Sequence, residues 1–112
     1  MAFNATLETI NDTAKILLFG ELDASTAPLF KEQVEKAAAQ NVKKLALLMN
    51  DLDYMSSAGL RVLIFAKQKM GSGVDIYIVS ANEMVMDTIQ KTGFHHSVIL
   101  LDEYDAAKFE PV

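Results

Sequence analysis

Two adjacent serines, Ser56 and Ser57, stand where this sequence most readily places chemistry. An apolar run at residues 45–49 precedes them and an amphipathic pattern at residues 60–70 follows, so we expect a buried strand to lead into a helix around them. The first turn of a helix has unpaired N–H groups and the positive end of the helix dipole, which suit a hydroxyl cap or a phosphate. Sites in open α/β sheets also gather beyond the carboxyl ends of the strands.

Two hypotheses account for these serines. In the first, one of them caps the helix and Gly59 allows the helix to pack closely against the strand. In the second, Ser57 is phosphorylated, which adds nearly two negative charges and three acceptor oxygens. The helix dipole would tolerate this phosphate, so the fold should survive it. Asp23, Asp51 or Asp53 would disfavour the phosphate if they surround it, and so would an acidic or apolar partner surface. The second hypothesis therefore describes a docking surface that is switched on and off.

Enzyme chemistry is poorly supported by the sequence. A hydrolase elbow requires the pattern G-x-S-x-G, and Met55 takes the place of the first glycine before Ser57. A serine nucleophile also needs a positioned base, but His95 and His96 follow an expected helix end, and we interpret them as loop-surface residues. The sequence shows neither convergent metal ligands nor a glycine-rich phosphate loop. We therefore expect a non-enzyme without catalytic residues, metal or cofactor.

Composition defines the broad class of protein. The 112 residues are 51% hydrophobic, which predicts a single packed domain over residues 1–112. The chain has no cysteine, no visible secretory signal and no apolar run near the ~20 residues that span a bilayer, so we expect a cytoplasmic protein without direct membrane insertion. The formal charge of −5 argues against nucleic acid as a partner, because binding to phosphates needs clustered lysine and arginine.

Apolar periodicity predicts an α/β fold. An initial strand pair is followed by alternating helices and strands, which implies right-handed crossovers and a mixed, mostly parallel β-sheet. The short turn at residues 11–13 makes the first two strands antiparallel, with the first strand at the edge or off the main sheet. The expected strands are residues 3–10, 15–20, 45–49, 74–79 and 98–101, and the expected helices end near Asn41, Met70, Lys91 and Phe109.

Caps and apolar stripes define the expected helices more closely. Residues 25–26 and Pro28 suit the start of the first helix, Ser80 with Glu83 has capping-box spacing for the third, and Asp102 is expected to cap the last. The residues expected on buried helix faces are Leu29, Phe30, Val34, Ala37 and Ala38 in the first helix, Leu60, Leu63, Ile64 and Met70 in the second, and Met84, Val85 and Ile89 in the third.

Two charged residues near the serines each have two interpretations. Asp23 either caps the region where the first helix begins or lies on the same surface as Ser57, since the ends of parallel neighbouring strands meet at one rim of a sheet. Arg61 is expected in the first turn of the second helix, where the dipole favours acids instead. It is either a surface charge, or a contact for a partner or for a phosphate on Ser57.

The chain resembles the STAS domain family, specifically its single-domain bacterial anti-sigma factor antagonists. The resemblance implies a mixed sheet with helices packed mainly on one face, and it places the phosphorylated serine of the family at Ser57. Ser56 and Ala58 replace the Asp and the Ser or Thr that flank this serine in well-known members, which leaves the kinase unspecified and adds Ser56 as a secondary phosphorylation site. The matching segments cover nearly the whole chain and are residues 20–23, 25–27, 45–49, 51–61, 73–79 and 89–94.

The resemblance implies a partner switch. The unphosphorylated antagonist would bind an anti-sigma factor that is itself a serine kinase and so release a sigma factor; phosphorylation of Ser57 would break the complex, and a protein phosphatase would restore it. Met49, Tyr54, Met55 and Leu60 are expected to supply adaptable apolar contacts. The residues expected to contact the partner are Asp23, Asp53, Tyr54, Met55, Ser56, Ser57, Ala58, Gly59, Leu60 and Arg61. The alternative is a STAS scaffold, or a ligand-sensing subunit of a transporter or signalling complex, which binds without being phosphorylated.

Overall fold

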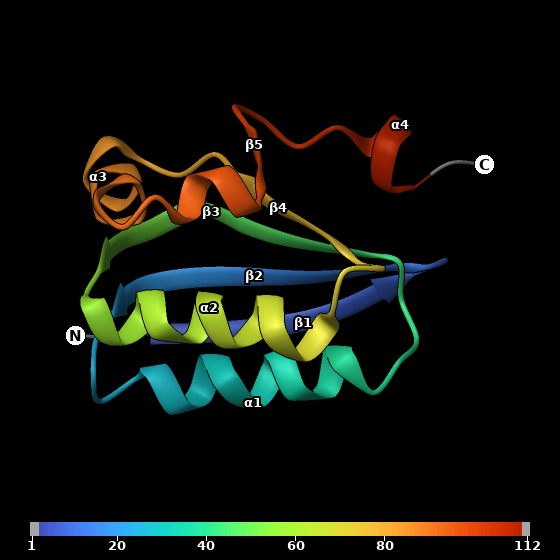
Figure 1. The fold of residues 1–112 in the computed structure, drawn as a ribbon, viewed down its shortest axis with the longest axis horizontal. Helices are drawn as coiled ribbons and strands as arrows, with labels where there is room; N and C mark the ends of the chain where they lie inside the picture. Colours follow the sequence, from blue (N-terminus) through green and yellow to red (C-terminus); the bar gives the residue numbers. More distant parts are fainter. Residues whose placement is uncertain (1–2, 111–112) are drawn as a thin grey trace.

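The computed structural model describes residues 3–110, which form a five-stranded sheet in the order β1-β2-β3-β4-β5 (Figure 1). β1 is antiparallel to β2 at one edge, and the other neighbouring strands are parallel. The expected α/β fold, with a mixed and mostly parallel sheet, is therefore confirmed. The elements are β1 (Phe3–Ile10), β2 (Thr13–Leu22), α1 (Ala27–Ala38), β3 (Lys44–Met55), α2 (Ser57–Met70), β4 (Asp75–Val79), α3 (Glu83–Lys91), the 3-10 helix η1 (Phe94–Ser97), β5 (Ile99–Leu101) and α4 (Ala106–Phe109).

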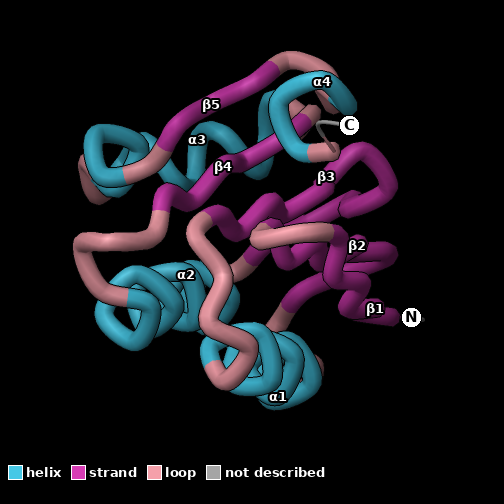
Figure 2. The backbone as a smooth tube through the Cα atoms, turned by 90° about the vertical axis from the view of Figure 1, so that its right-hand side faces the viewer, coloured by secondary structure: helices cyan, strands magenta, loops and turns pink. Residues whose placement is uncertain are grey.

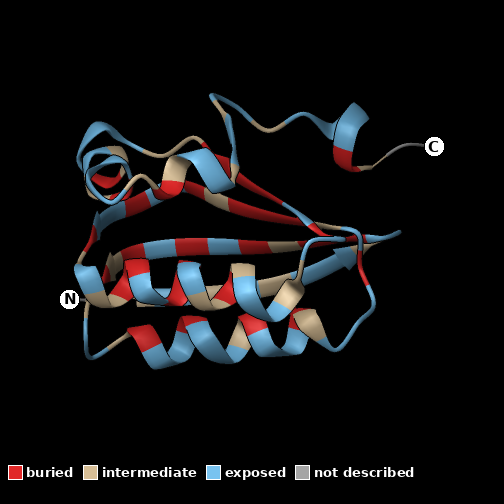
Figure 3. Ribbon diagram, viewed as in Figure 1, coloured by how far each residue is buried: buried red, intermediate tan, exposed pale blue. Residues whose placement is uncertain are grey.

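α1, α2 and α3 cover one face of the sheet, and α4 lies on the other (Figure 2). Buried residues recur about once per turn along α1 and α2, as in amphipathic helices that pack on a sheet (Figure 3). Phe30 and Val34 of α1 and Leu63 and Ala66 of α2 belong to this main core. Because α1 follows β2 and α2 follows β3, both helices begin at the carboxyl ends of the parallel strands and run side by side.

β3 continues six residues beyond the expected strand end, as far as Met55. Its register with β2 shifts twice, and each shift adds one residue to β3. The buried residues Met49, Leu52 and Met55 are therefore spaced by three positions, which breaks the alternation that identifies a strand in a sequence. Asp51 and Asp53 therefore lie within β3, although the strand was expected to end before them, at Met49.

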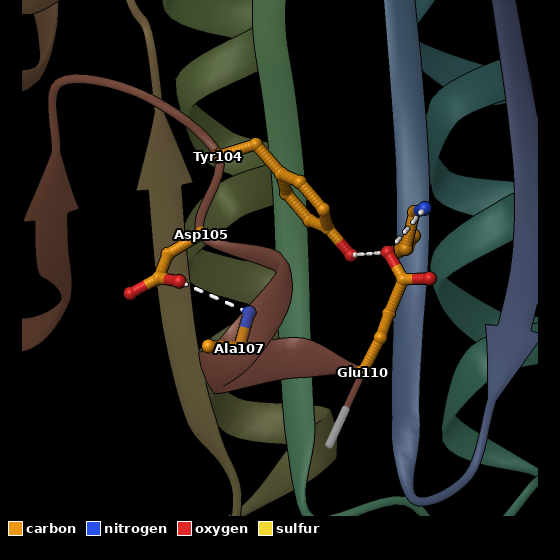
Figure 4. Close-up of polar contacts among 5 residues, drawn as sticks. Tyr104, Asp105, Ala107 and Glu110 are labelled. Atoms are coloured by element: carbon orange, nitrogen blue, oxygen red, sulfur yellow. Dashed lines mark hydrogen bonds and ion pairs between the residues drawn. The ribbon is translucent and has the colours of Figure 1, made fainter. Parts of the chain in front are cut away.

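The C-terminal segment, which includes α4, forms a second small core on the other face of the sheet. Phe109 is fully buried, and its ring lies edge-on to Tyr77 at 4.8 Å and stacks with Tyr104 at 5.2 Å. The Tyr104 hydroxyl donates a hydrogen bond to the Glu110 carboxylate (Figure 4). The Lys15 amine lies 3.6 Å from the same oxygen. The hydrogen bond from Tyr104 and, to a smaller extent, the Lys15 amine hold the pKa of Glu110 below its usual value.

Two helix caps differ from the expected ones. Asn82, and not Ser80, caps α3, and its Oδ1 accepts a first-turn backbone N–H at 2.8 Å. Asp105, and not Asp102, caps α4 by accepting the Ala107 N–H at 3.0 Å (Figure 4). Ser80 instead has a left-handed backbone with φ of 59°, and its hydroxyl donates to the Asp102 carbonyl at 2.8 Å. Its hydroxyl therefore stabilises the turns that follow β4 and β5.

Of the residues expected on buried helix faces, most are buried, Ala38 and Met70 are half-buried, and three are exposed. Leu29, Ile64 and Met84 are exposed by 50%, 37% and 48%. Each is adjacent in sequence to a residue that the core does bury, and consecutive helical residues point about 100° apart, so both cannot face the sheet. The expected core residues that the structure buries are Phe30, Val34, Ala37, Leu60, Leu63, Val85 and Ile89.

Candidate functional site

The carboxyl ends of β2 and β3 form a rim from which α2 begins. Leu22 at the end of β2 pairs with Met55 at the end of β3, and the Leu22 carbonyl accepts the Ser56 N–H at 2.8 Å. Asp23 and Ser57 each lie one residue beyond this hydrogen bond. The structure therefore brings Asp23 and Ser57 to the same rim, as one of the two interpretations of Asp23 required.

The two serines at this rim have different environments. Ser56 is the N-cap residue of α2, with an extended backbone and a carbonyl that accepts the Leu60 N–H at 3.1 Å. Its side chain makes no capping hydrogen bond, and its Oγ is buried without a hydrogen-bond partner among residues 3–110. Ser57 is the first residue of α2 and is exposed. The cap hypothesis therefore fits the backbone of Ser56, whereas Ser57 is the serine that solvent reaches.

Gly59 allows α2 to approach both strands more closely than any other residue would. A Cβ atom at this position would lie 2.7 Å from Cγ and Cδ2 of Leu22 and 3.0 Å from Cγ of Met55. Both of those side chains are almost fully buried and cannot move aside into solvent. The close helix–strand packing expected from Gly59 is therefore confirmed.

Asp23 organises the turn between β2 and α1. Its Oδ1 accepts the Ser25 hydroxyl at 2.7 Å, the Ser25 N–H at 2.9 Å and the Thr26 N–H at 3.2 Å. The Thr26 hydroxyl donates to the Glu21 carbonyl at 2.9 Å, which closes the turn. These hydrogen bonds, led by that from the Ser25 hydroxyl, lower the pKa of Asp23. Asp23 thus has both of its expected roles: it supports the start of α1 and places a carboxylate at the rim.

Asn82 supports the rim from a third element and was missed in the sequence. β4 ends at Val79, which pairs with Leu48, so the last residues of β3 lack a strand on that side. The Asn82 Nδ2 instead donates to the Leu52 carbonyl at 3.1 Å and the Asp53 carbonyl at 3.4 Å. The Asn82 side chain therefore caps α3 and also donates hydrogen bonds to backbone carbonyls at the open edge of β3. An asparagine directly before an acidic first helical turn is the signal that would have identified it.

The rim buries several residues that were expected to contact a partner. Met49, Met55 and Leu60 are at most 5% exposed and belong to the main core. The expectation that they supply apolar contacts at an interface is therefore wrong, because α2 packs too closely on the strands to leave them at the surface; Gly59 is buried for the same reason. Of the expected contact residues, Asp53, Tyr54, Ser57 and Arg61 are exposed, and Asp23, Ser56 and Ala58 are half-buried.

A groove lies beside Ser57, between the N-terminal halves of α1 and α2. Its lining includes Ala27 and Lys31 from α1 and Ala58, Arg61 and Phe65 from α2, and its volume is about 460 Å³. Within residues 3–110, Arg61 makes no ion pair or hydrogen bond. The site therefore combines an exposed hydroxyl, a fixed carboxylate and a free guanidinium group.

The histidines offer no base or metal site at this rim. His95 and His96 lie in η1 with ring centroids 3.9 Å apart, and neither is hydrogen-bonded to Ser57. His96 is exposed as expected, but His95 is half-buried and its Nδ1 has no hydrogen-bond partner in the described part of the chain. Over the same residues, no group of three or more His, Asp or Glu side chains could hold a metal ion. Nor is any described helix both long and apolar enough to cross a membrane.

Comparison with known proteins agrees with this architecture and places the chain in a family. The family model described as the STAS domain matches residues 4–107, so the chain belongs to the STAS domain family. The family resemblance inferred from the serine segment is therefore confirmed.

A curated relative resembles the chain in sequence, and solved structures share its fold. Anti-sigma-F factor antagonist RsfB of Mycobacterium tuberculosis is 24% identical over 92 residues, which cover 82% of this chain and 75% of RsfB. An anti-sigma factor antagonist from Mycobacterium paratuberculosis matches with a TM-score of 0.87 and 20% identity, over 96% of this chain and 92% of that one. The Bacillus cell fate determinant SpoIIAA in its phosphorylated form matches with a TM-score of 0.69 and 19% identity, over 87% and 90% of the two chains.

Replacing Gly59 with alanine should destabilise the protein. Alanine favours helices by about 1 kcal/mol over glycine, but the clash with buried Leu22 should outweigh this and lower the free energy of unfolding by about 1–3 kcal/mol. Urea unfolding of Gly59→Ala measures the change. Gly73→Ala is the matched control, since a Cβ there meets no atom within 4 Å, and it should stay within about 0.5 kcal/mol of wild type. Equal effects of the two substitutions would contradict the close approach.

The turn before α1 should contribute to stability in a pH-dependent way. The folded-state pKa of Asp23 is lowered, so its carboxylate stabilises the fold above the ordinary aspartate pKa of about 4, and this contribution is lost as pH falls through the lower, folded value. Wild type should therefore unfold at higher urea than Asp23→Asn at pH 7, and the gap should shrink in acid. Ser25→Ala removes the main cause of the lowered Asp23 pKa. The effect of Asp23→Asn on stability, measured in a Ser25→Ala background, should therefore depend less on pH. A gap that stays constant from neutral to acid pH would disprove this role.

Proposed function

We propose that this chain is an anti-sigma factor antagonist, a protein-binding module that phosphorylation of Ser57 switches off. The observation that carries the proposal is the contrast between the serines: Ser57 is exposed at the start of α2, while the Ser56 hydroxyl is buried. We therefore favour Ser57 over Ser56 as the phosphorylated residue. The relatives support the class, since RsfB is named an anti-sigma-F factor antagonist and SpoIIAA has been solved in a phosphorylated form.

The docking surface we propose consists of the exposed residues at the rim, Asp53, Tyr54, Ser57 and Arg61, together with the Asp23 turn. A phosphate on Ser57 adds nearly two negative charges beside the carboxylate that Asp23 already places there. The first N–H groups of α2 can accommodate an anion, so the packing behind the rim should not change. Phosphorylation therefore alters the charge and shape that a partner meets and leaves the fold intact.

The partner we propose is an anti-sigma factor with serine kinase activity. Binding of the unphosphorylated chain would free a sigma factor, phosphorylation of Ser57 would end binding, and a phosphatase would restore it, all in the cytoplasm. This chain would act as substrate and contact, not as catalyst, since no described side chain is hydrogen-bonded to Ser57 as a base. The formal charge of −5 favours a protein partner over nucleic acid.

Substitutions at Ser57 should separate the two states of the switch. Ser57→Ala cannot be phosphorylated and should stay bound to the kinase partner, whereas Ser57→Asp places a permanent negative charge at the rim and should bind at least about tenfold more weakly, a difference of about 1.4 kcal/mol. The measurement is affinity purification from the native cells, followed by titration of the purified partner.

Two controls make this result specific. Ser56→Ala should bind like wild type, because the Ser56 hydroxyl is buried. Ser57→Asp should melt at or above the wild-type temperature, because an acid in the first turn suits the helix dipole. An intact complex with Ser57→Asp would contradict the switch and favour a STAS scaffold or a ligand-sensing subunit of a transporter or signalling complex.

A further inference from the structure

The groove between α1 and α2 carries positive charge on an acidic protein. Two cationic residues, Lys31 of α1 and Arg61 of α2, line it, and its other lining side chains are apolar. The whole chain has a formal charge of −5. Neither helix has an acidic residue in its first turn, and the Asp23 carboxylate that precedes α1 is already hydrogen-bonded to Ser25 and Thr26.

Both cations are available to a ligand. Neither forms an ion pair with any residue from 3 to 110. The Lys31 amine lies 4.8 Å from the centroid of the Phe65 ring, an arrangement that holds the amine over the groove through a cation–π contact. The nearby carboxylate of Glu32 is turned to Lys36, 3.4 Å away in the next turn of α1. The groove therefore presents two unpaired positive charges around an apolar floor.

Arg61 also lies next to Ser57 on the surface of α2. Residues four apart on a helix are neighbours, with Cβ atoms about 5–6 Å apart. An anion placed N-terminal to a cation at this spacing is the favourable orientation. Both residues are exposed, so the guanidinium group can turn either toward the groove or toward a group on Ser57.

We propose that Arg61 responds to the phosphorylation state of Ser57. In the unphosphorylated chain, Arg61 and Lys31 bind a carboxylate of an acidic segment of the partner protein. In the phosphorylated chain, Arg61 binds the phosphate on Ser57 instead. Charge complementarity selects this occupant, because two unpaired cations and an apolar floor suit a segment with acidic and apolar side chains. A guanidinium group forms strong hydrogen bonds with carboxylate and with phosphate alike, so one residue serves both states. The proposal rests on the proposed function, to which it adds the chemistry of the partner and the means of release.

The test uses the full chain and a short blocked peptide of alternating glutamate and leucine, with glutamine replacing glutamate in the comparison peptide. Amide NMR titrations at low salt follow binding to wild type, to Arg61→Gln, and to protein with phosphoserine placed at position 57 during translation. The acidic peptide should shift the amide signals of the groove in wild type. Its affinity should fall at least about fivefold both in Arg61→Gln and in the phosphorylated protein. Lys69→Gln, a change at an exposed lysine in the last turn of α2, should leave the affinity unchanged.

Phosphorus NMR gives a second readout that needs no peptide. The phosphoserine at position 57 should have a pKa a few tenths of a pH unit lower in wild type than in Arg61→Gln, because the guanidinium group stabilises the dianion. Each of the following results would overturn the proposal: equal binding of the two peptides, no binding of either, an unchanged affinity in Arg61→Gln or in the phosphorylated protein, or an unchanged phosphate pKa. Because phosphoserine is installed without a kinase, such a failure leaves the Ser57 switch standing, and a failure of the switch in cells leaves the groove measurement valid.

Discussion

The start of α2 depends on a contact that leaves no room for a side chain. Gly59 lies against Leu22 and Met55 so closely that an added Cβ would come within 2.7 Å of Leu22, and the hydrogen bond from Ser56 to the Leu22 carbonyl fixes the same point through the backbone. Helical residues two apart point about 200° from each other. Burying Gly59 therefore turns Ser57 toward solvent, and the close packing itself creates the exposed hydroxyl.

The rim can change charge without changing its packing. The side chains behind it, such as Leu22 and Met55, are buried, and the Asp23 carboxylate is held by Ser25 and Thr26. A group added to Ser57 would lie in solvent. It would therefore change the surface that a partner meets and leave the packing of the core unchanged. This separation is what the proposed function requires, since one domain would serve as the substrate of a kinase and as a binding partner in alternate states.

Much of the fold could be predicted from the sequence because its periodicities are regular. β1 and the main helices follow from alternation, apolar stripes and caps, and the expected transition from strand to helix occurs at the two serines. The remainder depends on tertiary contacts. The two register shifts between β2 and β3 break the regular alternation of buried and exposed residues at the end of β3. Met55 therefore lies in the core although its sequence context resembles a loop. Asn82 acts on carbonyls some thirty residues away, a contact that local spacing does not encode.

Intact-mass spectrometry of the protein from its native cells, with fragmentation to locate any phosphate, shows directly whether Ser57 is modified. We expect a single phosphate on Ser57 in part of the population, with Ser56 unmodified because its hydroxyl is buried. Absence of phosphate under every growth condition, together with a Ser57→Ala strain that behaves like wild type, would contradict it. Ser57 would then be simply the first residue of α2, and binding at this rim would have to be sought without a covalent switch.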